Sequence, residues 1–133
     1  MKYFLIFISI LLIFSCSSNK QQERSFLGSI SKNPCIKHCE TYDLHIYSDG
    51  KFVYIGEENS AIKGIHEGNL SKKELLKIKQ LFKDLPKKDS YIKGNNVATI
   101  SIKYETLITR HEFNTSVFID FHNFVEGLYD RIP

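Results

Sequence analysis

The residues best suited to chemistry in this 133-residue chain lie in one short segment, Cys35-Ile36-Lys37-His38-Cys39. Two thiols and an imidazole at this spacing could supply three of the four ligands that a zinc ion takes. The same cysteines could instead form a disulfide or act as redox-active thiols. The spacer has three residues, whereas a thioredoxin-like motif has two. We favour the disulfide and keep a redox-active or metal-binding site at Cys35, His38 and Cys39 as the alternative.

A second group of candidate residues lies in a predicted β-hairpin over residues 42–56. Apolar and polar residues alternate there on both sides of Asp49-Gly50, a dipeptide typical of a two-residue type I′ turn. This turn fixes the register, and a slip of one residue would exchange the two faces of the hairpin. The predicted core face carries two apolar pairs, Ile46 with Val53 and Leu44 with Ile55.

The other face of this hairpin is then aromatic. The predicted register places His45 opposite Tyr54 and Tyr47 opposite Phe52. An aromatic surface of this kind can stack on sugars or hold peptides. A helix or a neighbouring strand could also cover it as a second core layer, so the sequence leaves both interpretations open.

Motifs of common enzymes are missing from the sequence. It contains no Gly-x-Ser-x-Gly, no His-Glu-x-x-His, no P-loop and no Gly-x-Gly-x-x-Gly. We therefore expect a binding or interaction module rather than an enzyme. We assign no catalytic residue, no metal ligand and no cofactor.

The amino terminus predicts export and a membrane anchor. Lys2 precedes an apolar run that ends at Phe14, which is typical of a secretory signal and is shorter than the ~20 residues that span a bilayer. The next residues, Ile13-Phe14-Ser15-Cys16, resemble the lipobox of bacterial lipoproteins. We therefore expect a signal peptide over residues 1–15, a lipidated Cys16 with a polar tether over residues 16–24, and one domain over residues 25–133.

This location restricts the partners. A lipid-anchored protein of the cell envelope meets the membrane through its lipid, and envelope proteins or glycans around it. No acidic cluster follows Cys16, which favours an outer-membrane protein that faces the periplasm. The net charge of +3 is small, so neither charge nor compartment indicates a nucleic-acid partner. Because lipid occupies Cys16, the two remaining cysteines are free to pair with each other.

The clearest helix signal begins at Ser71. Ser71 and Glu74 fit a capping box, and Pro86 ends the apolar helical periodicity. The helix is basic outside its apolar stripe. Its lysines could meet the phosphate head groups of a membrane, although a solvated helix face is the interpretation that we favour. These lysines are Lys72, Lys73, Lys77, Lys79 and Lys83.

The remaining segments complete an α+β domain. We expect a first strand over residues 25–31, a strand over residues 61–69 that Gly64 and Gly68 loosen, a second hairpin over residues 97–113 and a closing helix over residues 116–131. Together they predict an antiparallel sheet of about five strands, including two β-hairpins, with two helices packed on one face.

Several motifs in the expected order resemble a bacterial family, domain of unknown function 6438. The resemblance extends from about Ser25 through both helices. It implies an intact domain with paired cysteines, and it brings no activity, cofactor or catalytic residue. The motifs are Pro34-Cys35-x3-Cys39, Tyr42, Ile46-Tyr47-Ser48-Asp49-Gly50, Tyr54, Gly56 and Gly68-x-Leu70-Ser71.

Overall fold

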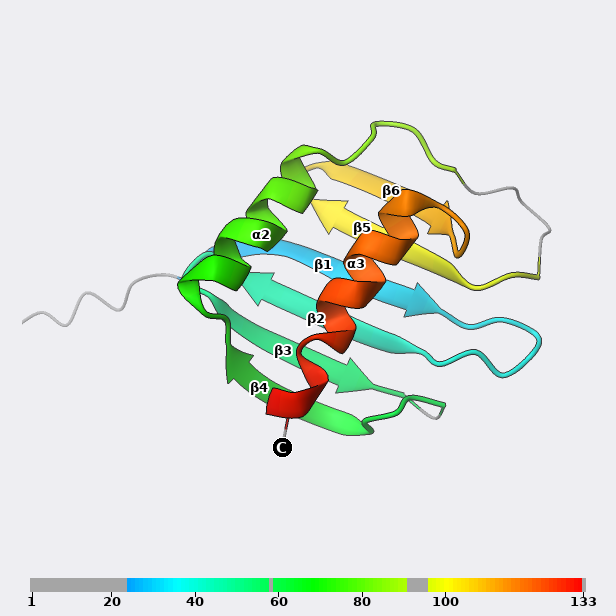
Figure 1. The fold of residues 1–133 in the computed structure, drawn as a ribbon, viewed down its shortest axis with the longest axis horizontal. Coiled ribbons are helices and arrows are strands. Elements are labelled where there is room, and N and C mark those ends of the chain that lie inside the picture. Colours follow the sequence, from blue (N-terminus) through cyan, green and yellow to red (C-terminus); the bar gives the residue numbers. More distant parts are fainter. Residues whose placement is uncertain (1–23, 58, 91–95, 133) are drawn as a thin grey trace, which may run out of the picture.

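The computed structural model describes residues 24–57, 59–90 and 96–132. The predicted signal peptide and Cys16 lie outside these residues, as does the tether up to residue 23. Figure 1 shows the arrangement of the helices and strands. In chain order these are β1 (Phe26–Asn33), β2 (Tyr42–Tyr47), β3 (Lys51–Gly56), β4 (Gly64–Asn69), α2 (Lys72–Lys83), β5 (Thr99–Tyr104), β6 (Leu107–Glu112), α3 (Ser116–Glu126) and the 3-10 turn η1 (Tyr129–Arg131).

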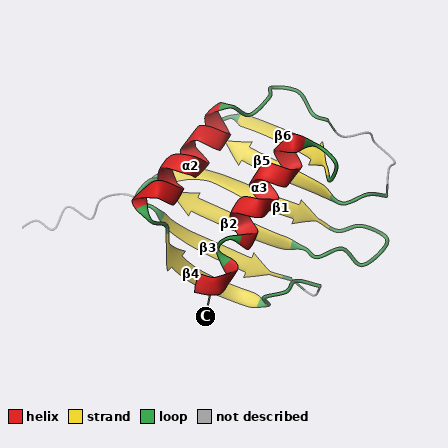
Figure 2. Ribbon diagram, viewed as in Figure 1, coloured by secondary structure: helices red, strands yellow, loops and turns green. Residues whose placement is uncertain are grey.

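The strands form one sheet in the order β4-β3-β2-β1-β5-β6, and all neighbouring strands are antiparallel (Figure 2). The predicted α+β class is confirmed, with six strands in the described residues rather than about five. Strand β1 lies between the two predicted hairpins because it pairs with both β2 and β5. One N-terminal strand therefore joins two locally formed units into a single sheet.

Both helices cover the same face of the sheet (Figure 1). This helix-covered face holds the core, where Phe82 of α2 stacks on Tyr104 of β5 at 5.0 Å between ring centroids and meets Phe121 of α3 at 5.5 Å. No described helix lies over the opposite face, which we call the open face. An antiparallel sheet tolerates this arrangement because its strands can alternate between apolar and polar side chains.

The register of the first hairpin differs from the prediction by one residue. Ile46 pairs with Phe52 rather than with Val53, and Leu44 pairs with Tyr54. The turn has three residues instead of two: the Gly50 amide donates to the Tyr47 carbonyl oxygen, and Gly50 adopts a φ of +89°. A three-residue hairpin loop closes in this way, with glycine in the left-handed position after a tight turn.

This shift exchanges the β3 side chains between the two faces of the sheet. Phe52 and Tyr54 are buried in the core, whereas Val53 and Ile55 lie half-buried on the open face. The four predicted aromatic residues therefore do not share one surface, and that prediction was wrong for Phe52 and Tyr54.

The helix ends follow capping chemistry. The predicted capping box is present, because the Ser71 hydroxyl accepts from the Glu74 amide and the Glu74 carboxylate accepts from the Ser71 amide. Helix α3 is shorter than predicted: it ends at Glu126, and Gly127 caps it before η1 begins. Gly127 keeps a right-handed backbone with a φ of −63°, and the rest of the predicted helix up to Arg131 forms the 3-10 turn η1 instead.

Gly68 in β4 has a packing role that the sequence did not reveal. A Cβ atom built on this residue would lie 2.3 Å from Cζ of Phe52. Gly68 pairs with Phe52 across β3 and β4, so the missing side chain is what admits the Phe52 ring into the core. The residue thus tightens the packing of an edge strand that we had expected it to loosen.

No described helix is both long enough and apolar enough to cross a membrane.

Candidate functional site

The open face retains part of the predicted aromatic surface. His45 and Tyr47 of β2 point to this face and remain half-exposed. The ring centroid of Phe26 lies 6.3 Å from that of His45 and 6.3 Å from that of Tyr47, with an edge-on orientation toward the tyrosine. Lys103 Nζ lies 5.8 Å from the centre of the Phe26 ring. These four side chains form what we call the open-face patch: Phe26, His45, Tyr47 and Lys103.

Phe26 joins this patch because β1 contains an irregularity. The pairing of β1 with β2 shifts between Phe26 and Gly28, so that Phe26 lies opposite Tyr47 and Gly28 opposite Ile46. A bulge of this kind changes the direction of a side chain relative to the regular alternation. No pattern in the sequence indicates this irregularity, since regular alternation from buried Ile30 would have placed Phe26 on the core face. Phe26 is nevertheless 43% exposed.

Elsewhere on the open face, short side chains lie on the central strands and exposed apolar side chains lie toward both edges. Short hydroxyl side chains occupy the central strands, with Ser31 of β1 opposite Ser101 of β5. At the β4 edge, Ile65 is 71% exposed and pairs with Ile55, and at the β6 edge Ile108 is 67% exposed. Exposed apolar side chains on a sheet face that no described helix covers are typical of an interaction surface.

The predicted disulfide between Cys35 and Cys39 is confirmed, with the two Cα atoms 5.3 Å apart. His38 lies in the same loop, is exposed and adopts a φ of +56°. Because the two sulfur atoms are bonded to each other, neither is a thiolate that could ligate a metal in this form. No group of three or more His, Cys, Asp or Glu side chains among the described residues is arranged to hold a metal ion.

A shallow apolar hollow of about 310 Å³ lies beside this disulfide. Both cysteines contribute to its lining together with Val97, Ala98 and Phe113, and Phe113 is 57% exposed. The hollow lies where the β1–β2 loop meets the chain before β5. It is a second candidate contact surface, and the sequence had indicated only its cysteines.

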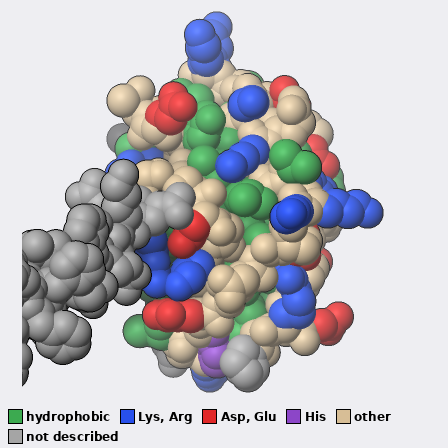
Figure 3. Space-filling model, turned by 90° about the vertical axis from the view of Figure 1, so that its left-hand side faces the viewer, with side chains coloured by type: hydrophobic (Ala, Val, Ile, Leu, Met, Phe, Trp, Pro, Cys, Tyr) green, Lys and Arg blue, Asp and Glu red, His purple; other side chains and the backbone are tan. Residues whose placement is uncertain are grey.

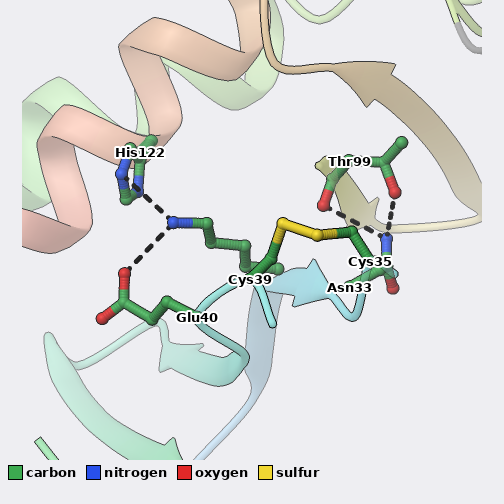
Figure 4. Close-up of a disulfide and its surroundings, with 7 residues drawn as sticks. Asn33, Cys35, Cys39, Glu40, Thr99 and His122 are labelled. Atoms are coloured by element: carbon green, nitrogen blue, oxygen red, sulfur yellow. Dashed lines mark hydrogen bonds and ion pairs between the residues drawn. A yellow bond between two sulfur atoms is a disulfide. The ribbon is translucent and has the colours of Figure 1, made fainter. Parts of the chain in front are cut away.

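A partly buried ionic cluster that sequence reasoning missed lies on the other side of the disulfide loop (Figure 4). Lys32 Nζ contacts a Glu40 carboxylate oxygen at 3.1 Å and His122 Nε2 at 3.4 Å. The Tyr42 hydroxyl lies 2.9 Å from His122 Nδ1, and the Tyr129 hydroxyl donates to the other Glu40 oxygen at 2.8 Å. The cluster joins β1 and the disulfide loop to α3 and η1, which lie about 80 to 100 residues later in the chain.

The electrostatics of this cluster favour one charge state. Burial, and then the Lys32 ammonium, lower the pKa of His122. Burial acts to raise the pKa of Glu40, but hydrogen bonds from the Ala61 amide, Tyr129 and Lys32 outweigh it and hold that pKa below its ordinary value. The cluster therefore holds an ammonium, a carboxylate and a neutral imidazole.

Both ring nitrogens of His122 have polar neighbours. Nδ1 lies 2.9 Å from the Tyr42 hydroxyl, and Nε2 lies 3.4 Å from Lys32 Nζ and 3.4 Å from a Glu126 carboxylate oxygen. No buried side-chain nitrogen or oxygen among the described residues lacks a hydrogen-bond partner. The cluster thus acts as a polar clamp between the helix layer and the sheet.

A second histidine is also held by hydroxyl groups. Ser90 Oγ lies 2.7 Å from His111 Nδ1, and Thr109 Oγ1 lies 3.0 Å from His111 Nε2. Burial lowers the pKa of His111, whose side chain is fully enclosed. A serine beside an imidazole suggests acyl transfer, but both ring nitrogens of this enclosed histidine are engaged with hydroxyls. We therefore interpret the pair as a contact that attaches the Ser90 segment to β6.

The fold and its faces define the class: a small antiparallel α+β domain with one helix-covered face and one open face. The chain belongs to the family of the domain of unknown function DUF6438, whose model matches residues 29–117. The matched segment includes the disulfide, the first hairpin and α2, and it begins three residues after Phe26. No curated protein and no solved structure matches the chain.

Proposed function

We propose that this chain is a lipid-anchored lipoprotein of the bacterial cell envelope whose domain is a non-enzymatic binding module. The lipid is attached at Cys16, and the domain faces the periplasm from the outer membrane. The open face of the sheet binds the partner. The observation that supports this proposal most directly is the open-face patch, where Phe26, His45 and Tyr47 lie together and accessible on a sheet face without a described helix over it.

The partner that fits this surface best is an envelope protein. A glycan could stack on the aromatic rings, but the exposed Ile65 and Ile108 at the two edges offer aliphatic surface that a protein side chain fills better. Aromatic side chains at the centre of such a surface are the usual hot spots of binding energy. Tyr47 combines an apolar ring with a hydroxyl, which suits a surface that is exposed to water when free and buried when the partner is bound.

The test is affinity capture of the lipidated protein from native envelope, followed by mass spectrometry. A partner retained by the wild type should be lost from Phe26→Ala and Tyr47→Ala variants, each of which should weaken binding by about thirtyfold. Phe113→Ala is the matched control, since it removes an aromatic ring of similar exposure from the hollow beside the disulfide.

The outcomes separate the two surfaces. Loss of the partner from Phe113→Ala alone would assign binding to the hollow and refute the open-face proposal. Equal loss from all three variants together with lower thermal stability would show that Phe26 and Tyr47 support the fold instead. Capture of purified glycan by the wild type, abolished by Tyr47→Ala, would replace the protein partner by a carbohydrate.

A second candidate function is a redox or metal site at Cys35, His38 and Cys39. It is favoured by the partial exposure of both cysteines, which line the apolar hollow. Intact mass of the protein purified from envelope distinguishes the cases. A mass two hydrogens below that of the dithiol, without bound zinc, supports a stable disulfide, whereas free thiols with stoichiometric metal would favour this second candidate.

A further inference from the structure

Helix α2 is more basic than its surroundings. It carries five lysines and one glutamate, a net charge of +4. Its glutamate, Glu74, is engaged by Arg131 at 2.6 Å, so it neutralises little of the lysine charge. Helix α3 in the same layer carries Asp120 and Glu126 and no lysine, a net charge of −2. The two helices therefore give the helix-covered side of the molecule one basic and one acidic half.

The lysines of α2 surround an exposed leucine. Leu76 is 69% exposed, although it belongs to a helix whose other apolar residues pack against the core. Lys72 and Lys73 lie four and three positions before it, and Lys79 lies three positions after it, so all three are its neighbours on the helix surface. A single exposed apolar side chain among lysines can insert between anionic lipid head groups while the lysines meet the phosphates.

The start of α2, with Lys72 and Lys73, lies at the end of the molecule where β1 begins. We call this the basic end. The Ser48 amide donates to the Ser25 carbonyl oxygen at 2.9 Å, and the Leu70 amide donates to the Gly50 carbonyl oxygen at 2.8 Å. The start of β1, the β2–β3 turn and the start of α2 are therefore in direct contact. Figure 3 shows this end of the molecule, where Lys and Arg side chains spread over the surface with apolar side chains and several Asp and Glu side chains between them.

The length of chain before this end limits how far it lies from the membrane. Seven residues lie between Cys16 and Arg24, and the eight Cα-to-Cα steps of a fully extended chain reach at most about 28 Å. The basic end is thus the part of the domain closest to the point of lipid attachment. Anionic head groups attract lysines that lie within about a Debye length of the surface.

We infer that α2 docks on anionic phospholipid head groups, with Lys72, Lys73, Lys77 and Lys79 over the phosphates and Leu76 inserted between them. This inference rests on the proposed lipid anchor and adds an orientation to it. The acidic α3 points away from the membrane, because the same head groups repel it. The open face remains at the side of the domain, where a partner can reach it.

Lysine footprinting of the intact lipidated protein tests this inference. The protein is reconstituted into vesicles of phosphatidylcholine with or without phosphatidylglycerol, and acylation of each lysine is followed by mass spectrometry. Phosphatidylglycerol should lower the reactivity of Lys72, Lys73 and Lys77 about fivefold, and high salt should restore it. The exposed Lys37 and Lys63 are internal controls, since both lie in loops at the opposite end of the strands.

Two variant pairs sharpen the test. Lys72→Gln with Lys73→Gln should abolish the protection of Lys77, whereas Lys37→Gln with Lys63→Gln removes the same charge and should leave it unchanged. Leu76→Ser should also weaken the protection, because it removes the inserted side chain without altering the charge. If the variant with Lys37→Gln and Lys63→Gln also loses the protection of Lys77, the effect depends on net charge alone, and the docking geometry is overturned.

Three other outcomes would refute the docking of α2 on lipid. Equal labelling in both kinds of vesicle would refute head-group docking. Protection of α2 in native envelope but not in pure lipid would assign this surface to an acidic protein and overturn the inference. Failure of the protein to float with either kind of vesicle would show that the anchor itself is absent, and both proposals would fall.

Discussion

Replacement of Gly68 by alanine measures how closely the edge strand packs on the core. The added Cβ would lie 2.3 Å from Cζ and 2.6 Å from Cε1 of Phe52, whereas ordinary contacts begin at 3.4 Å. The Phe52 ring must therefore retreat by about 1 Å, yet it is only 2% exposed and enclosed by the core. Overpacking of this kind costs roughly 1–3 kcal/mol.

The unfolded chain offsets part of this cost. Alanine restricts the unfolded backbone more than glycine does, which contributes about 0.4–1 kcal/mol in the opposite direction. We expect Gly68→Ala to lower the free energy of unfolding by about 1–2 kcal/mol in urea denaturation. A cooperative transition with an unchanged slope would place the effect in the folded state.

Gly127→Ala is the matched control. Gly127 has a φ of −63°, and a Cβ there would lie 3.4 Å from its nearest neighbours, so alanine fits without strain. We expect this variant to be neutral or more stable by a few tenths of a kcal/mol. Adding Phe52→Leu to Gly68→Ala should cost less than Phe52→Leu alone, because the smaller side chain relieves the clash. Wild-type stability of Gly68→Ala would refute the packing argument.

Three further predictions concern the disulfide loop and the polar cluster. The free energy of unfolding should fall as the pH drops from about 6.5 through the lowered pKa of His122, because the unfolded state then binds the proton more readily. The loss should continue below the ordinary pKa of Glu40, whose pKa is also lowered in the folded state. In urea denaturation measured over a series of pH values, His122→Gln should reduce the loss at the higher pH values. Replacing Cys35 and Cys39 by serine should lower the free energy of unfolding by roughly 2 kcal/mol, the loop-closure value for so short a loop, and the same loss should appear when the wild type is reduced. Tyr129→Phe should cost about 1–2 kcal/mol in thermal denaturation, since it removes a hydrogen bond to a carboxylate, and no change would show that water replaces the hydroxyl.

The acid dependence has a second contributor. Burial also lowers the pKa of His111, so this residue destabilises the fold at low pH with the same sign. His122→Gln should therefore reduce the acid loss without removing it. A pH profile identical to that of the wild type would show that the His122 environment does not differ between the folded and unfolded states.

Local chemistry was readable from the sequence. The capping box at Ser71 and Glu74 was predicted and is present, because both partners lie within one helical turn of each other. The disulfide was predicted because two cysteines remain once Cys16 is assigned as the predicted lipidation site. The α+β class followed from segments whose apolar spacing differs between helices and strands.

What the sequence could not decide was the face on which particular side chains lie. One residue of register in the β2–β3 turn moves Phe52 and Tyr54 from the open face into the core, and the bulge in β1 moves Phe26 in the opposite direction. Both outcomes depend on the backbone at one position each: the left-handed conformation of Gly50 in the turn and the bulge after Phe26 in β1. A strand alternates with a period of two, so each one-residue choice reverses the result.

Local sequence patterns were enough to predict the helices and strands, the capping of α2 and the cysteine pair, and they also predict an anchor at Cys16. Only the tertiary structure brought Phe26 beside Tyr47, and Lys32 between Glu40 and His122. Phe26 and Tyr47 are 21 residues apart, and Lys32 and His122 are 90 residues apart, whereas Lys32 and Glu40 are separated by only 8. Such contacts form when β1 is inserted between two hairpins, and no local pattern encodes that order of strands.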